Sequence, residues 1–182
     1  IYYAKKDFQA AANYFKRLAE SAKNEQYLLQ GRAGLMRCHF QLKKWDETLL
    51  VANQLLTDAK LSDELKREAN YYAGKSYLSL QREDKALEAF LKIAGETSSA
   101  WGAEAKYQVC DLYYRANQPD KALEHIKSFI ELNTSHQYWL AKAFIVLANI
   151  SIDNQNDFEA KQYLQSVKEN YKGKDDVQQE VT

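Results

Sequence analysis

The feature that most constrains this chain is a nine-residue motif that recurs five times at nearly constant spacing. The copies are DFQAAANYF, KWDETLLVA, REDKALEAF, QPDKALEHI and NDFEAKQYL, and they begin 37, 38, 36 and 38 residues apart. The fifth residue of each copy is small, and these residues are Ala11, Thr48, Ala86, Ala122 and Ala160. A period of this length is typical of a supersecondary unit that is stacked several times. The sequence therefore predicts a repeat protein.

A second motif lies upstream of the last four copies. Its segments are GRAGLMRCHFQL, ANYYAGKSYLSL, AKYQVCDLYYRA and AFIVLANISIDN, which begin at Gly31, Ala69, Ala105 and Ala143. Their apolar residues recur at three- and four-residue intervals, as on one face of a helix. The small first residue allows two helices to approach to the short end of the roughly 8–10 Å range of interaxial distances. Each unit is therefore expected to be a helical hairpin.

Composition agrees with an all-helical chain and excludes two classes of function. One Pro and 6 Gly in 182 residues are too few for the turns of a β protein. The 25 basic and 25 acidic residues give zero formal charge, which argues against nucleic acid as the partner. The longest apolar stretch, Leu140–Ile152, is interrupted by Lys142 and Asn149 and falls short of the roughly 20 residues that a membrane span needs.

The pattern predicts nine helices, at about 2–20, 25–42, 45–58, 63–81, 83–94, 99–116, 119–132, 136–153 and 157–171. Ser62, Ser99 and Ser135 are predicted N-caps, because a serine hydroxyl accepts a hydrogen bond from the first helical turn. Pro119 is expected at a first helical position. Gly173 is expected to end the last of these helices.

No catalytic, metal or cofactor site is predicted. His39, His125 and His136 are scattered and form no metal-ligand spacing. Cys38 and Cys110 lie far apart within helical patterns, and we interpret them as buried thiols. The chain is therefore predicted not to be an enzyme within these residues.

The residues that recur at equivalent positions of these two motifs resemble the tetratricopeptide repeat. The closest match is Gly74 with Tyr77, followed by Ala86 with Phe90. The units are longer than the 34 residues usual in the family, they lack its terminal Pro, and Thr48 replaces an Ala. The resemblance implies an all-α, right-handed α-solenoid of about five helical hairpins. It implies one array over residues 1–182, with units at about 1–25 (partial), 25–60, 62–96, 99–133 and 135–172, and with 173–182 opening a further helix.

The long units are similar to variant repeats of Gram-negative bacterial cell-envelope proteins, and the last unit is similar to those of the Bacteroides group. This resemblance implies a periplasmic or outer-membrane-associated location, with the cytoplasm as the alternative. The missing capping units suggest a fragment of a longer array. Apolar surface around Ile1, Tyr2 and Tyr3 is then expected to allow self-association.

In the tetratricopeptide family the first helices line a concave groove, and the resemblance places ten residues there. They are Arg37, Gln41, Tyr71, Lys75, Tyr107, Asp111, Tyr114, Arg115, Asn149 and Asp153. Aromatic side chains among charges of both signs suit a protein-binding surface. The alternative is that the tyrosines bridge neighbouring hairpins. The clamp by which some members hold a C-terminal carboxylate is not reproduced, because Ala33, Arg37, Tyr72 and Gln108 occupy its places.

The leading hypothesis is a non-enzymatic scaffold whose groove binds a protein or peptide partner, in bacterial cell-envelope assembly or maintenance. One alternative is a cytoplasmic regulatory domain that senses a peptide. Another is the helical platform of an enzyme whose active site lies outside this segment.

Overall fold

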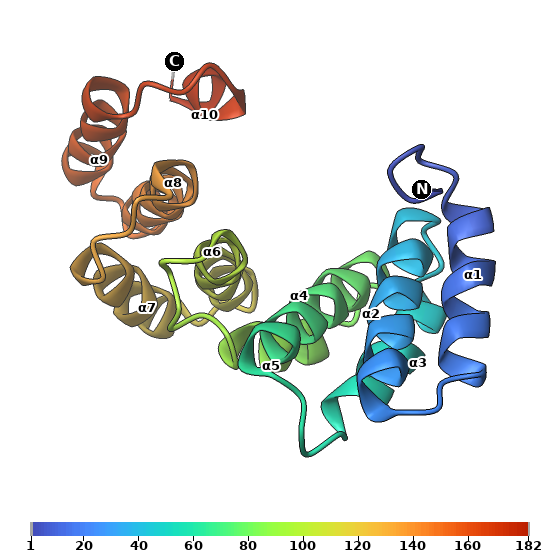
Figure 1. Cartoon of the computed structure of the whole chain (residues 1–182). Helices are drawn as coiled ribbons and strands as arrows, with labels where there is room; N and C mark the ends of the chain where they lie inside the picture. The colour runs from blue at the N-terminus through green and yellow to red at the C-terminus, as the bar shows by residue number, and fades with distance from the viewer. Residues whose placement is uncertain (1, 182) are drawn as a thin grey trace. The chain divides into compact units, whose positions relative to one another are not determined.

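The computed structural model describes residues 2–181, and the regular secondary structure of this part is helical throughout (Figure 1). This confirms the all-α class; Ile1 lies outside the described residues. The helices are α1 (Phe8–Glu20), α2 (Glu25–Gln41), α3 (Trp45–Leu56), α4 (Asp63–Ser79), α5 (Glu83–Leu91), α6 (Ala100–Arg115), α7 (Pro119–Glu131), α8 (Gln137–Asp153), α9 (Asp157–Asn170) and α10 (Asp176–Glu180).

The chain divides into two compact units, Ile1–Lys92 and Ile93–Thr182. In the first unit α2 packs on α3 and α4 packs on α5, while α1 packs on α2. In the second unit α6 packs on α7, α8 packs on α9, and α6 also packs on α8. The repeated element is thus the helical hairpin that the two motifs predict. One array through both units stays a prediction.

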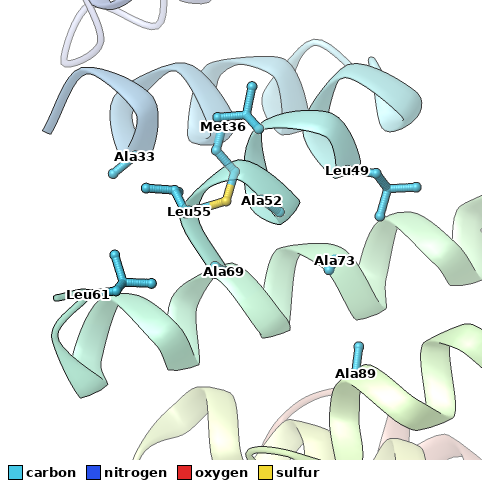
Figure 2. Close-up of a cluster of buried hydrophobic side chains, with 10 residues drawn as sticks. Ala33, Met36, Leu49, Ala52, Leu55, Leu61, Ala69, Ala73 and Ala89 are labelled. Atoms are coloured by element: carbon cyan, nitrogen blue, oxygen red, sulfur yellow. The ribbon is translucent and has the colours of Figure 1, made fainter. Parts of the chain in front are cut away.

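The small fifth residues of the first motif, which we call the small column, lie where the two helices of a hairpin meet. Ala86 and Ala122 are fully buried, and Ala160, the most exposed of the five, is 3% exposed. Figure 2 shows Met36 pointing from α2 toward Ala52 and Leu55 of α3, in the core of the first unit. Larger side chains at the small column would push the helices of a hairpin apart, because protein interiors are close-packed.

Gly31 and Gly74, each in the first helix of a hairpin, are also required by the close approach of two helices. A Cβ added at Gly74 of α4 would lie 2.6 Å from the ring of Phe90 of α5. A Cβ added at Gly31 of α2 would lie 2.7 Å from the backbone nitrogen of Ala19 of α1. These two glycines serve close helix approach rather than a turn.

Each hairpin is closed by the same turn, and this turn uses no glycine. Lys43 has φ of 57°, and its N–H donates to the carbonyl of Phe40 while the next N–H donates to that of His39, both at 2.9 Å. This pair of bonds defines a Schellman motif, whose left-handed residue is usually Gly. The equivalent left-handed residues, with φ between 54° and 60°, are Lys6, Gln81, Asn117 and Gln155.

We expect Gln81→Gly to raise the free energy of unfolding by up to about 1 kcal/mol. The left-handed conformation costs a side-chain-bearing residue about 1–2 kcal/mol, which exceeds the extra chain entropy that Gly loses on folding. Asn117→Gly should gain less, since Asn tolerates this conformation. Urea unfolding monitored by circular dichroism measures both. Glu88→Gly, inside α5, is the control and should lose about 1 kcal/mol; a loss at Gln81 as well would contradict the strain argument.

The first predicted helix starts too early. Residues 2–7 form a turn, in which the N–H of Lys6 donates to the carbonyl of Tyr3 and that of Asp7 to the carbonyl of Tyr2. The Asp7 carboxylate then caps α1 by accepting from the N–H of Ala10 at 3.0 Å. Helix α1 therefore begins at Phe8 rather than near residue 2. The turn has the same hydrogen-bond pattern as the later Schellman motifs.

Two of the three predicted serine caps are confirmed. Ser62 and Ser99 accept from the N–H groups of Leu65 and Gly102, and Pro119 opens α7. The cap at Ser135 is wrong, because α8 begins at Gln137 with His136 at the N-cap position. The buried hydroxyl of Thr134 holds this entry, accepting from the N–H of His136 at 3.1 Å. Within residues 2–181, no helix is long and apolar enough to span a membrane.

Candidate protein-binding surfaces

Four of the ten predicted groove residues lie in the first unit and define the α2–α4 surface: Arg37, Gln41, Tyr71 and Lys75. Arg37 of α2 forms a bidentate pair with Glu68 of α4, since its Nε and Nη2 groups donate to the two carboxylate oxygens. The Glu68 side chain is only 4% exposed, whereas that of Arg37 is 39% exposed. The hydrogen bonds to Glu68 raise the pKa of Arg37. Arg37 thus joins two neighbouring first helices.

Beside this pair lies an aromatic cluster that reaches from α2 to α4. The rings of Phe40 and Tyr72 are 4.7 Å apart and meet edge to face, and Tyr72 meets Tyr71 in the same way at 5.5 Å. Burial raises the pKa of Tyr72 to about 12. Tyr71 and Lys75 are half-buried, and Gln41 is exposed. Tyr72, which was not predicted to bind, supplies the link across this surface, and Tyr71 packs on it.

The other six predicted residues lie in the second unit and define the α6–α8 surface: Tyr107, Asp111, Tyr114, Arg115, Asn149 and Asp153. Tyr107 of α6 stacks on Trp139 of α8 with ring centres 5.5 Å apart and planes 23° apart. Burial, and then the nearby Asp111, raises the pKa of Tyr107 to about 12. The Tyr107 hydroxyl is therefore neutral at physiological pH, and its ring helps to join the two helices.

The C-terminal ends of α6 and α8 carry the polar part of the α6–α8 surface. The Tyr114 hydroxyl donates to the Asp153 carboxylate at 2.8 Å. Arg115 donates to Asp111 at 3.5 Å, one turn back on α6. Asn149 is half-buried one turn before Asp153. A hollow of about 480 Å³ opens here, lined by Tyr114, Arg115, Asn117, Pro119, Ile150, Asp153 and Asn154.

The structure thus brings the ten predicted residues together as two sets, one in each unit. Arg37, Tyr107 and Tyr114 bridge neighbouring first helices, as the alternative interpretation of the tyrosines expects. Arg115 and Asp153 are also exposed at the hollow. A binding role for the ten residues, and one channel shared by all of them, stay predictions.

Sequence reasoning missed several residues of these surfaces. Glu68 and Trp139 are the partners of Arg37 and Tyr107, while Asn117, Pro119 and Asn154 line the hollow. Glu68 lies 31 residues after Arg37, which is about one repeat length minus two helical turns. A basic and an acidic residue at this spacing were the sequence signal that could have revealed the pair. No sequence signal indicated the hollow, because its shape depends on the angle between two helix ends.

His125 takes part in helix packing. His125 of α7 lies 3.2 Å from the Lys106 amine of α6, which also donates to Ser128 at 3.2 Å. Burial lowers the pKa of Lys106, and burial and the Lys106 charge lower that of His125. The same two columns in the next hairpin hold Phe144 and Tyr163, with rings 6.4 Å apart. Lys106 and His125 thus form a polar contact at two positions where the next hairpin has an aromatic contact.

Cys38 and Cys110 are fully buried, as predicted. Burial raises the pKa of the Cys38 thiol to about 11 and that of Cys110 to about 12, so both are protonated and weakly nucleophilic. Among residues 2–181, no three His, Cys, Asp or Glu side chains gather as metal ligands would.

The helical hairpins and their small-residue columns define a tetratricopeptide-type repeat fold. Residues 68–96 match a family model described as tetratricopeptide repeat. A search of curated protein sequences gave no match.

Solved structures show the same fold over most of the chain. A crystal structure of MamA is 18% identical with a TM-score of 0.75, and the match covers 92% of this chain and 91% of MamA. MamA from Desulfovibrio magneticus RS-1 is 18% identical with a TM-score of 0.71, covering 92% and 88%. A putative kinesin light chain from Podosopora anserina, with nearly identical TPR-like repeats, is 14% identical with a TM-score of 0.68, covering 92% and 88%.

Proposed function

We propose that the chain is a non-enzymatic scaffold that binds a segment of a partner protein, and that the α6–α8 surface is a principal contact. The observation that carries this proposal is the set of groups around the hollow of about 480 Å³, where Tyr114, Arg115 and Asp153 meet. Tyr and Arg are enriched among residues that dominate binding energy. The Arg115 cation and the Asp153 carboxylate lie at the same hollow, and together they suit a bound peptide that carries side chains of both charge signs.

A photo-crosslinking amino acid at position 115 should capture a partner that the same group at Lys127 does not. Lys127 is exposed on α7, away from the residues that line the hollow. With the purified partner, exchanging the charges by Arg115→Glu with Asp153→Arg should weaken binding by about tenfold or more. The matched control is Lys127→Glu with Glu131→Lys, which makes the same kind of exchange on α7. Equal affinities for the two folded variants would remove the α6–α8 surface from the proposal.

The proposed setting is the bacterial cell envelope, at the periplasm or outer membrane, in assembly or maintenance. The support is the resemblance of the long repeat units to envelope proteins, and fractionation of native cells tests it. A cytoplasmic peptide-sensing domain is the competing proposal. Self-association is a further element, supported by a hollow of about 500 Å³ lined by Tyr2, Tyr3, Ala11, Tyr14 and Phe15.

A further inference from the structure

A lysine is buried in the α6–α7 hairpin without an acidic partner. Lys106 of α6 is only 5% exposed. Its amine lies 3.2 Å from Nδ1 of His125 and donates to the Ser128 hydroxyl at 3.2 Å, and both of these residues belong to α7. Within residues 2–181, no carboxylate forms an ion pair with this amine. Buried charges are usually paired, whereas this one rests on two groups that carry no negative charge.

The contact fixes the protonation state of His125. An ammonium group has three donors and no acceptor, so Lys106 can donate a hydrogen bond to His125 only when Nδ1 is unprotonated. Protonation of the ring would replace this hydrogen bond by two positive charges 3.2 Å apart. The neutral imidazole is therefore compatible with the packed hairpin, and the imidazolium is not.

The surroundings of the pair offer little compensation for a second positive charge. On α6, Cys110 and Tyr113 face the pair, and the Tyr113 ring stacks on His125 with ring centres 5.3 Å apart. On α7, the Lys121 amine lies over the Tyr113 ring, 5.4 Å from its centre. Glu124, the acidic group that acts on both members of the pair, is exposed to solvent, which screens its charge. Helix α8 packs on both helices with apolar side chains of the shared core.

The repeat does not require two bases at these positions. Three other hairpins have different pairs there: Arg32 with Val51, Asn70 with Ala89, and Phe144 with Tyr163. Each of these pairs contains at most one side chain that can carry a positive charge. The last pair is an aromatic contact, with rings 6.4 Å apart. Among these hairpins, only α6–α7 therefore packs a second base against a buried one.

We propose that Lys106 and His125 form an acid-sensitive contact, and that uptake of one proton by His125 loosens the α6–α7 hairpin. A histidine in an unfolded chain has a pKa of about 6.5, whereas burial and the Lys106 charge lower the pKa of His125 in the folded protein. The open state therefore binds more protons than the packed state between these two values. Stability is undiminished above about pH 6.5 and falls as the pH drops toward the folded-state pKa. This goes beyond the proposed function, because it requires no partner.

Amide hydrogen exchange of the full chain at pH 7.5 and pH 5.0, corrected for the intrinsic exchange rate, tests the proposal. The opening constant of α7 should rise about tenfold between the two values, as expected for uptake of one proton. Helix α9 is the internal control and should change much less, because its equivalent pair, Phe144 and Tyr163, contains no base. Burial also lowers the pKa of His39, but His39 lies in the first unit and does not distinguish α7 from α9.

Two variants separate this contact from a general loss of stability in acid. His125→Gln keeps an acceptor for the Lys106 amine but cannot be protonated, so the tenfold rise in α7 should disappear. Lys106→Phe with His125→Tyr copies the pair of the next hairpin and gives a second background without either base. His136→Gln is the matched control and should retain the response of the parent.

NMR titration of the His125 ring provides a direct measurement. The ring should titrate below pH 6.5 in the parent, and Lys106→Met should shift the midpoint upward because it removes the neighbouring positive charge. A midpoint that Lys106→Met leaves unchanged, or a rise in α7 exchange that persists in His125→Gln, would overturn the proposal.

Discussion

Replacing Ala122 by Glu is expected to unfold the α6–α7 hairpin and to lower the stability of the protein by about 3–5 kcal/mol. Ala122 is fully buried among Cys110, Ile126 and Phe129. A glutamate there adds volume to a close-packed crossing and places a carboxylate without a partner in an apolar environment. Thermal melting and urea unfolding, both followed by circular dichroism, measure the effect.

The control for Ala122→Glu is Lys127→Glu, which introduces the same side chain at an exposed position of α7. It should change the stability by no more than about 0.5 kcal/mol. Indistinguishable melting curves for Ala122→Glu and the parent would mean that the small column does not lie at the helix crossing.

The second large effect is expected at Arg37. Arg37→Ala leaves the carboxylate of Glu68, which is 4% exposed, without its partner. Breaking a fully buried pair costs about 3–5 kcal/mol. Because the Arg37 side chain is 39% exposed, solvent screens part of this loss, and we expect about 2 kcal/mol. Replacing both residues, by Arg37→Met with Glu68→Leu, should recover most of the stability.

The protein offers a matched control in a second arginine pair. Arg82 donates to Asp46 at 3.3 Å, with side chains 46% and 68% exposed. Arg82→Ala removes the same group from an exposed pair and should cost less than about 1 kcal/mol. Equal losses for Arg37→Ala and Arg82→Ala, measured by urea unfolding, would show that burial of Glu68 does not decide the effect.

The hairpin and its packing could be predicted from sequence because they depend on local patterns. The small column at Ala86 and Ala122 and the caps at Ser62 and Ser99 follow from residue type and spacing. Ser135 failed as a cap because a tertiary hydrogen bond decides that helix start: the Thr134 hydroxyl donates to the carbonyl of Thr97 at 2.6 Å. A contact 37 residues away in the chain has no local signal.

The candidate surfaces were predictable only in part, for a related reason. Helical periodicity indicates which face of a first helix a residue occupies, and the resemblance to the tetratricopeptide repeat implies that Tyr107, Asp111 and Tyr114 line the groove. Neither indicates which of them is already engaged by the neighbouring helix. Stacking of Tyr107 on Trp139 depends on how α6 and α8 cross. The same holds for the hollow at Arg115, whose walls come from two helix ends and a turn.

The hairpin turn has a consequence for how relatives of such a chain are recognised. One backbone conformation recurs at Lys6, Lys43, Gln81, Asn117 and Gln155, but no single residue type occupies all five positions. None of the five is the glycine that is usual at this place. A comparison by residue identity therefore finds no common letter at the most regular point of the repeat. A comparison of backbones finds the same turn five times. The unit that matches the family model, residues 68–96, carries such a non-glycine turn at Gln81, and solved structures align over 92% of the chain.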